Sequence, residues 1–141
     1  MIAVDTNVLI YACDRADPRR QQIALDLVTN AEDGVLLWQV ACEFISASRK
    51  LSKQGFTSTH AWNRLAEFRA LLPLVLPSEA MLARAKELHL TRGASFWDAL
   101  VLAACVDAAV KLAPRRPRSR NVFRRPCPGL QSTSSRRQKS P

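Results

Sequence analysis

The 141-residue chain has few aromatic residues (6%), only four glycines and no long hydrophobic run. No apolar stretch approaches the roughly 18 residues that cross a bilayer. Asp5 lies where a signal peptide would be apolar. We therefore expect a cytoplasmic protein with no membrane partner. The length and the hydrophobic content of 48% fit one domain of ordinary composition.

Cysteine and histidine lack the spacing of a metal or nucleophilic centre. No pair of cysteines forms a C-x-x-C motif, and the first three lie in apolar helical patterns, so we interpret the four as small core residues. These are Cys13, Cys42, Cys105 and Cys127. His60 and His89 have no acid or nucleophile at an informative spacing, so a Ser-His or Cys-His mechanism has no support.

Acidic residues are absent from the end of the chain. Residues 114–141 carry nine Lys and Arg, five Pro, five Ser and no acid, whereas residues 1–113 carry twelve basic and twelve acidic residues. The end segment therefore carries all of the net charge of +9. It has too few hydrophobic residues to offset its ordering entropy. We expect a folded domain over 1–113 and a disordered basic tail over 114–141.

Short apolar runs alternate with amphipathic segments along the first 112 residues. The runs at 1–4, 35–38 and 74–76 predict buried parallel strands. Helical periodicity predicts helices over 7–13, 18–29, 39–53, 57–72, 78–89 and 96–112. The last is apolar on nearly every face, which is typical of a helix packed deep in a domain. The alternation favours an α/β fold with a parallel sheet covered on both sides.

Three acidic residues lie where packing does not need them. Asp5 ends the first strand, Glu43 lies about one turn into the helix after the second strand, and Asp98 begins the last helix. Ligands of an open parallel sheet bind beyond the carboxyl ends of its strands, where these acids can converge. Converging carboxylates repel one another unless a cation lies between them, and ligands made only of oxygen select Mg²⁺ or Mn²⁺.

Each acid also has a structural interpretation. Asp5 can cap the helix that begins at Thr6 or Asn7, and the run from Ser95 to Asp98 fits a capping box. Glu43 can be a solvated helix residue, which is the commonest fate of a glutamate. Taken singly, these residues favour the structural interpretation.

Three segments resemble the blocks that characterise PIN-domain ribonucleases, in both order and spacing. They are VDTNVLIYA at 4–12, VACEF at 40–44 and SFWDALVLAA at 95–104. The likeness covers about residues 1–112 and is strongest to VapC-type toxins of type II toxin-antitoxin pairs. It implies a three-layer α/β/α PIN-like fold with a short parallel sheet. It also implies a Mg²⁺- or Mn²⁺-dependent endoribonuclease that hydrolyses RNA phosphodiester bonds, a cognate antitoxin as partner, and a homodimer.

The resemblance assigns roles to named positions. The metal would be held, and catalysis carried, by Asp5, Glu43 and Asp98, and the site would be supported by Thr6, Asn7 and Ser95. A bound cation of this kind polarises a phosphodiester and lowers the pKa of a bound water. Because the acids repel RNA, a cationic rim is needed. The candidates that flank the acid-bearing segments are Arg15, Arg19, Arg20, Arg49, Lys50 and Lys53.

The chain departs from the family after its last predicted helix. Members usually continue with a fourth strand that ends in a further acid, but no acid follows Asp107 here. We therefore expect the sheet to lack its last strands. A frameshift near the codons for residues 110–114 would explain the change, and a native basic arm is the alternative. Two other functions stay open: an impaired PIN-like module that retains only antitoxin or RNA binding, and RNA binding by the charge of the tail.

Overall fold

The computed structural model describes residues 1–112, and the predicted tail and Cys127 lie outside them. Within this range six α-helices and one 3₁₀ helix accompany a four-stranded parallel sheet. The strands are β1 (Ile2–Ala3), β2 (Gly34–Leu37), β3 (Leu74–Val75) and β4 (Lys111–Leu112). The helices are α1 (Thr6–Cys13), α2 (Pro18–Thr29), α3 (Trp38–Ala47), η1 (Ser48–Gln54, 3₁₀), α4 (Ser58–Leu71), α5 (Glu79–Arg92) and α6 (Phe96–Asp107).

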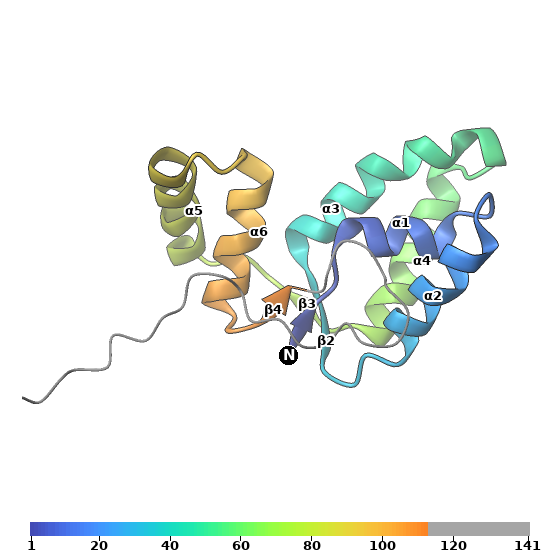
Figure 1. Cartoon of the computed structure of the whole chain (residues 1–141), viewed down its shortest axis with the longest axis horizontal. Coiled ribbons are helices and arrows are strands. Elements are labelled where there is room, and N and C mark those ends of the chain that lie inside the picture. The colour runs from blue at the N-terminus through green and yellow to red at the C-terminus, as the bar shows by residue number, and fades with distance from the viewer. Residues whose placement is uncertain (113–141) are drawn as a thin grey trace, which may run out of the picture.

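The sheet has the strand order β3-β2-β1-β4, and every neighbouring pair is parallel. Ile2 pairs with Gly34 on one side and with Lys111 on the other, so β1 is a central strand. Helices α1 to α4 lie on one side of the strands and α5 with α6 on the other (Figure 1). This confirms the predicted α/β class.

The core is made where β2 meets the helices on the α1 side of the sheet. Leu9, Leu36, Leu37 and Phe44 are fully buried. A Cβ added at Gly34, the first residue of β2, would lie 2.6 Å from a Leu72 methyl carbon. Only glycine therefore fits at this position without a shift of its neighbours.

The end of α6 corrects the prediction of a helix up to residue 112 and of a sheet without a strand beyond it. The helix ends at Asp107, and Ala109 adopts a left-handed φ of 52°. The Val110 N–H then donates to the Cys105 carbonyl, and the Lys111 N–H donates to the Met1 carbonyl at 3.1 Å. Helices commonly end at a glycine, but here the residue at the turn is alanine. The apolar pattern therefore continues past the end of the helix, and the predicted helix is too long.

The burial of α6 also differs from the prediction of a helix packed deep in the domain. Ala99, Leu100, Ala103, Ala104 and Cys105 are buried, and the helix packs against α5. Phe96, Trp97, Leu102 and Val106 of the same helix are exposed. The helix also contacts α3, but these four apolar side chains remain exposed within residues 1–112.

The predicted helix over 39–53 is divided in two. Its first part is α3, and from Ser48 the chain tightens into η1, which ends at Gly55 with a φ of 75°. Glycine reaches this left-handed conformation at little cost, which explains why the segment stops at Gly55. No helix in the described part of the chain is both long and apolar enough to cross a membrane.

Candidate active site

Asp5 follows β1 after one intervening residue, Val4, and is the N-cap of α1. Its backbone is extended, and its carboxylate accepts a hydrogen bond from the Asn7 N–H at 2.9 Å. The side chain is buried although it is acidic. A carboxylate at a helix N-terminus is stabilised by the unpaired amides of the first turn, so the capping interpretation is confirmed. This capping role is compatible with a second role at the same edge of the sheet.

Thr6 and Glu43 join the first two of the acid-bearing segments. The Thr6 hydroxyl donates to the Glu43 carboxylate with an oxygen-oxygen distance of 2.5 Å. Thr6 is buried and Glu43 is half-buried, and they come from α1 and α3. Hydrogen bonds to an ionised acceptor are short and strong, so this contact fixes how Glu43 is oriented. The structure therefore places Glu43 beside the start of α1. Glu43 is thus not simply a solvated helix residue, because it is half-buried and hydrogen-bonded to Thr6.

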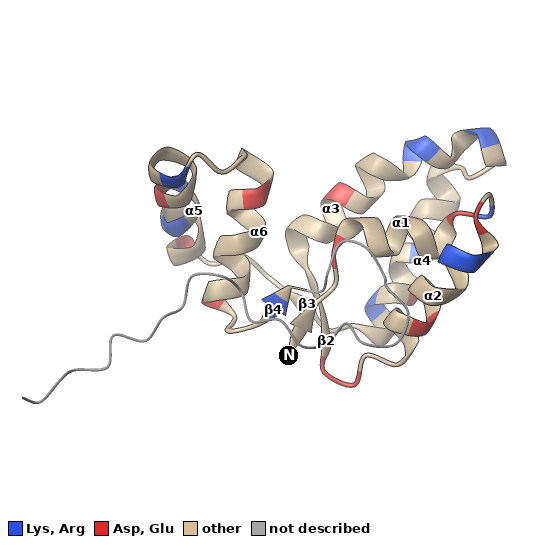
Figure 2. Ribbon diagram, in the orientation of Figure 1, with Lys and Arg blue, Asp and Glu red and all other residues tan. Residues whose placement is uncertain are grey.

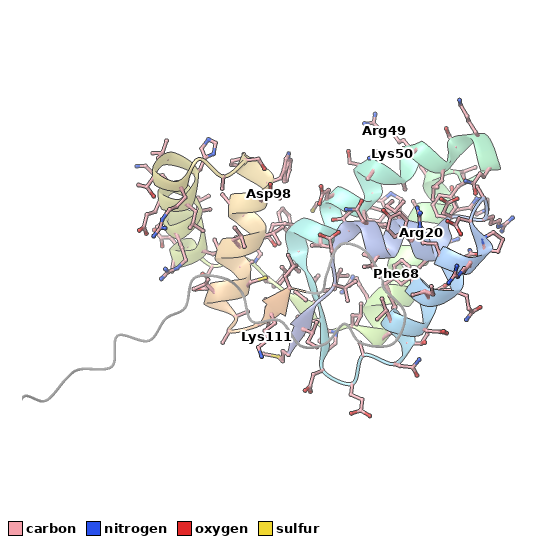
Figure 3. The ribbon with its side chains drawn as sticks, in the orientation of Figure 1. Arg20, Arg49, Lys50, Phe68, Asp98 and Lys111 are labelled. Atoms are coloured by element: carbon pink, nitrogen blue, oxygen red, sulfur yellow. The ribbon has the colours of Figure 1, made fainter. Side chains whose placement is uncertain are left out.

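Asp98 lies in the first turn of α6 and is half-buried. The Ser95 hydroxyl accepts from the Asp98 N–H at 3.2 Å and donates to its carboxylate at 2.8 Å. Ser95 is thus the predicted N-cap of α6, and it also orients Asp98. Figure 3 shows Asp98 on the side of α6 that faces α3.

A surface pocket of about 620 Å³ connects α3 and η1 with the start of α6. It is lined by Cys42, Glu43, Ser46, Ala47, Arg49, Lys50 and Trp97. Trp97 directly precedes Asp98 in the chain. The pocket therefore brings one predicted acid, two predicted cations and the first turn of α6 to one place.

The acids do not form a metal centre in this structure. Their oxygen donors suit Mg²⁺ or Mn²⁺ chemically. However, among residues 1–112 no three His, Cys, Asp or Glu side chains lie close enough together to hold a metal ion. The contacts described above join Thr6 to Glu43 and Ser95 to Asp98, and the structure does not bring all three carboxylates together.

The predicted cationic set divides into two groups. Arg49 and Lys50 line the pocket with Glu43. Arg20 instead pairs with Asp17 at 3.3 Å and lies 4.8 Å above the Tyr11 ring. Basic residues accordingly lie on both η1 and α2 (Figure 2). Arg15, Arg19 and Lys53 are also exposed.

The cysteines correct the core prediction in one case. Cys13 and Cys105 are buried, but Cys42 is exposed and lines the pocket. Partial burial nevertheless raises the pKa of the Cys42 thiol above its ordinary value. Burial also raises the pKa of Cys13, against the opposing effect of the nearby Arg64 guanidinium.

The sequence did not single out Cys42 or Trp97 as pocket residues: Cys42 was interpreted as a core residue, and Trp97 was given no role of its own. The only available signal was their position next to Glu43 and Asp98. Helical periodicity places such residues on a face, but it does not show which faces of two separate helices meet.

Comparison with protein families gives a match over most of the chain. The family model of the PIN domain matches residues 2–115, which is most of the chain and includes all three acid-bearing segments. No curated protein matches the chain at the significance applied. The match spans every strand and helix described above, and the parallel sheet is consistent with a PIN-like fold. The chain therefore belongs to the PIN domain family.

Proposed function

We propose that the protein is an endoribonuclease that requires Mg²⁺ or Mn²⁺ and hydrolyses RNA phosphodiester bonds. Membership of the PIN domain family indicates a nuclease. The choice of RNA and the need for a divalent cation are our proposals. The pocket is the observation that supports them most, because Glu43 lies there together with Arg49, Lys50 and the turn that carries Asp98.

The residues of the proposed site have distinct parts. Asp5, Glu43 and Asp98 would supply the carboxylate oxygens that a hard divalent cation prefers. Thr6 orients Glu43 and Ser95 orients Asp98 through the hydrogen bonds described above. Asn7 supports the site through its backbone amide, which binds Asp5. Cations on η1 would offset the repulsion between the acids and an RNA backbone.

The biological setting is a second part of the proposal. We infer a VapC-type toxin of a type II toxin-antitoxin pair, with a cognate antitoxin and a homodimeric state. The exposed apolar side chains of α6, among them Phe96 and Trp97 whose rings are in contact, support a protein partner. Growth arrest of a host cell on expression, relieved by co-expression of a candidate antitoxin, would test this setting.

Cleavage by variants of the full chain tests the proposed site. Glu43→Gln keeps the hydrogen-bond acceptor for Thr6 but removes the charge, so we expect Mn²⁺-supported RNA cleavage to fall by roughly 10²-fold or more. Glu87→Gln, on exposed α5, is the matched control and should cleave normally. A folded Glu43→Gln protein that cleaves RNA at the wild-type rate would contradict the proposal.

An impaired PIN-like module that binds antitoxin or RNA without cleavage is the second candidate. The separation of the three acids within residues 1–112 favours it, as does the absence of an acid after Asp107. The candidates differ in one measurement. The impaired module predicts RNA binding with no cleavage at any Mn²⁺ concentration.

A further inference from the structure

The pocket combines features that a catalytic carboxylate does not need. Its volume of about 620 Å³ is within the range of small-molecule sites. One wall is formed by residues between Cys42 and Lys50, which include one acid and two cations. Trp97 also lines the pocket. An acid alone explains neither an aromatic ring nor the paired cations at this place.

Trp97 presents a large aromatic surface to solvent. Its side chain is 53% exposed although it begins an otherwise apolar helix. The Phe96 ring packs edge-on against it, with centroids 5.5 Å apart, and His89 packs against Phe96 at 6.3 Å. These ring contacts support the first turn of α6 from the α5 side. The indole therefore lies on a supported helix turn rather than on a loose loop.

Arg49 and Lys50 supply the positive charge of the same pocket. Arg49 Nε donates to the Ser46 carbonyl at 3.1 Å, and this hydrogen bond restrains the conformation of the Arg49 side chain. The salt bridges within residues 1–112 are those of Arg20 with Asp17 and of Arg64 with Glu67, so neither pocket cation is neutralised by one. Both side chains are exposed to an approaching anion.

We infer that this pocket binds a nucleotide of single-stranded RNA, with its base stacked on Trp97 and its phosphates on Arg49 and Lys50. The inference rests on the proposed function and deepens it by naming Trp97 as a base-binding residue and Arg49 and Lys50 as phosphate-binding residues. A base within a duplex is already stacked on its neighbours, so only an unpaired base can use the indole. Stacking tolerates every base, because each has an aromatic face. The bound nucleotide would lie next to Glu43 and Asp98.

Binding without cleavage is the first test. The full chain is titrated against a labelled single-stranded RNA in EDTA, at near-physiological salt. Trp97→Ala should weaken binding roughly 5- to 100-fold, as expected for the loss of one base-aromatic stack. Trp97→Phe should keep most of the affinity. Trp62→Ala is the matched control, because Trp62 is 60% exposed on α4 and does not line the pocket.

The role of the base is separated from that of the charge by changing the ligand. On an oligonucleotide with abasic positions, Trp97→Ala should bind as well as the wild type. Arg49→Ala should weaken binding to both ligands and reduce the salt dependence by about one unit of slope. Equal affinity of Trp97→Ala and Trp62→Ala for the base-containing RNA would overturn the inference.

Fluorescence gives a second readout that keeps Trp97 in place. In a Trp38→Phe, Trp62→Phe background, Trp97 is the single tryptophan of the chain, and stacking on RNA should quench its emission. Unchanged emission at saturating RNA would also overturn the inference. Because both measurements use EDTA, Trp97-dependent binding without Mn²⁺-supported cleavage would reject the proposed function and leave the binding site standing.

Discussion

The Thr6 hydroxyl donates a 2.5 Å hydrogen bond to the Glu43 carboxylate, across 37 positions of the sequence. It ties the first turn of α1 to α3 at the edge where β1 ends. Thr6 directly follows Asp5, the cap of that turn, so this one contact places Glu43 near a second acid. The position of Glu43 therefore depends on a neutral side chain as well as on its own helix.

Replacement of Thr6 by Val keeps the shape of the side chain but removes the donor. A hydrogen bond to a charged group is worth about 1.5–3 kcal/mol, so we expect RNA cleavage to fall roughly 10- to 100-fold. Thr6→Ser retains the hydroxyl and should restore most of the rate. Initial rates and thermal melts of both variants check this, and a folded Thr6→Val protein with the wild-type rate would show that Glu43 needs no such support.

Replacement of Asp98 by Asn separates charge from capping. The amide oxygen can still accept from the Ser95 hydroxyl, so α6 should keep its cap. We expect the cleavage rate to fall by roughly 10²–10³-fold with little change in stability. Asp107→Asn, at the other end of the same helix, is the control and should retain the rate. Wild-type cleavage by a folded Asp98→Asn protein would favour a purely structural role for this acid.

The turn between α6 and β4 gives a prediction about stability. Ala109 has a φ of 52°, a conformation that costs an L-residue about 1–2 kcal/mol and glycine little. Ala109→Gly should therefore raise the free energy of unfolding by about 1 kcal/mol in denaturant titrations. Ala108→Gly, at a right-handed position, should lower it. If the helix continued to residue 112, both substitutions would destabilise the protein.

Alkylation should distinguish the cysteines of the described range. Cys42 is exposed, whereas Cys13 and Cys105 are buried, so iodoacetamide should label Cys42 first in the native protein. The thiolate is the reactive form, and burial raises the pKa of Cys42 above the ordinary 9.0. The labelling rate should therefore keep rising with pH beyond pH 9. Peptide mapping by mass spectrometry follows each site, and a rate that levels off below pH 8 would contradict the raised pKa.

Labelled Cys42 also reports on the pocket. A bulky adduct there should weaken RNA binding, because Cys42 shares the pocket with Arg49 and Trp97. The same reagent should leave a Cys42→Ser protein with full affinity. Full affinity of the labelled wild type would show that RNA does not enter the pocket.

The sequence was sufficient to predict the elements whose ends carry clear start or stop residues. Pro18 opens α2, Thr57 and Ser78 cap α4 and α5, and Gly55 and Gly93 end their segments in left-handed conformations. Proline, hydroxyl caps and glycine act through local sterics and hydrogen bonds, which a sequence pattern records directly. The alternation of these elements was enough to predict the α/β class.

The sequence was insufficient where distant segments decide the outcome. Strand β4 is two residues long and exists through its pairing with β1, which no local pattern shows. The exposed face of α6 and the exposure of Cys42 depend on which helices meet. The same limit applies to the site, since adjacency to Glu43 and Asp98 alone did not single out Cys42 or Trp97.

The measurement that bears most directly on the proposed activity is cleavage of RNA by the purified full chain with Mn²⁺ and with EDTA. We expect cleavage in Mn²⁺, its loss when the cation is chelated, and its return when Mn²⁺ is added in excess. Glu43→Gln analysed in parallel would guard against a contaminating nuclease, since such activity would not respond to the substitution. Undiminished cleavage in chelator that nevertheless depends on Glu43 would contradict a divalent-cation mechanism at this site.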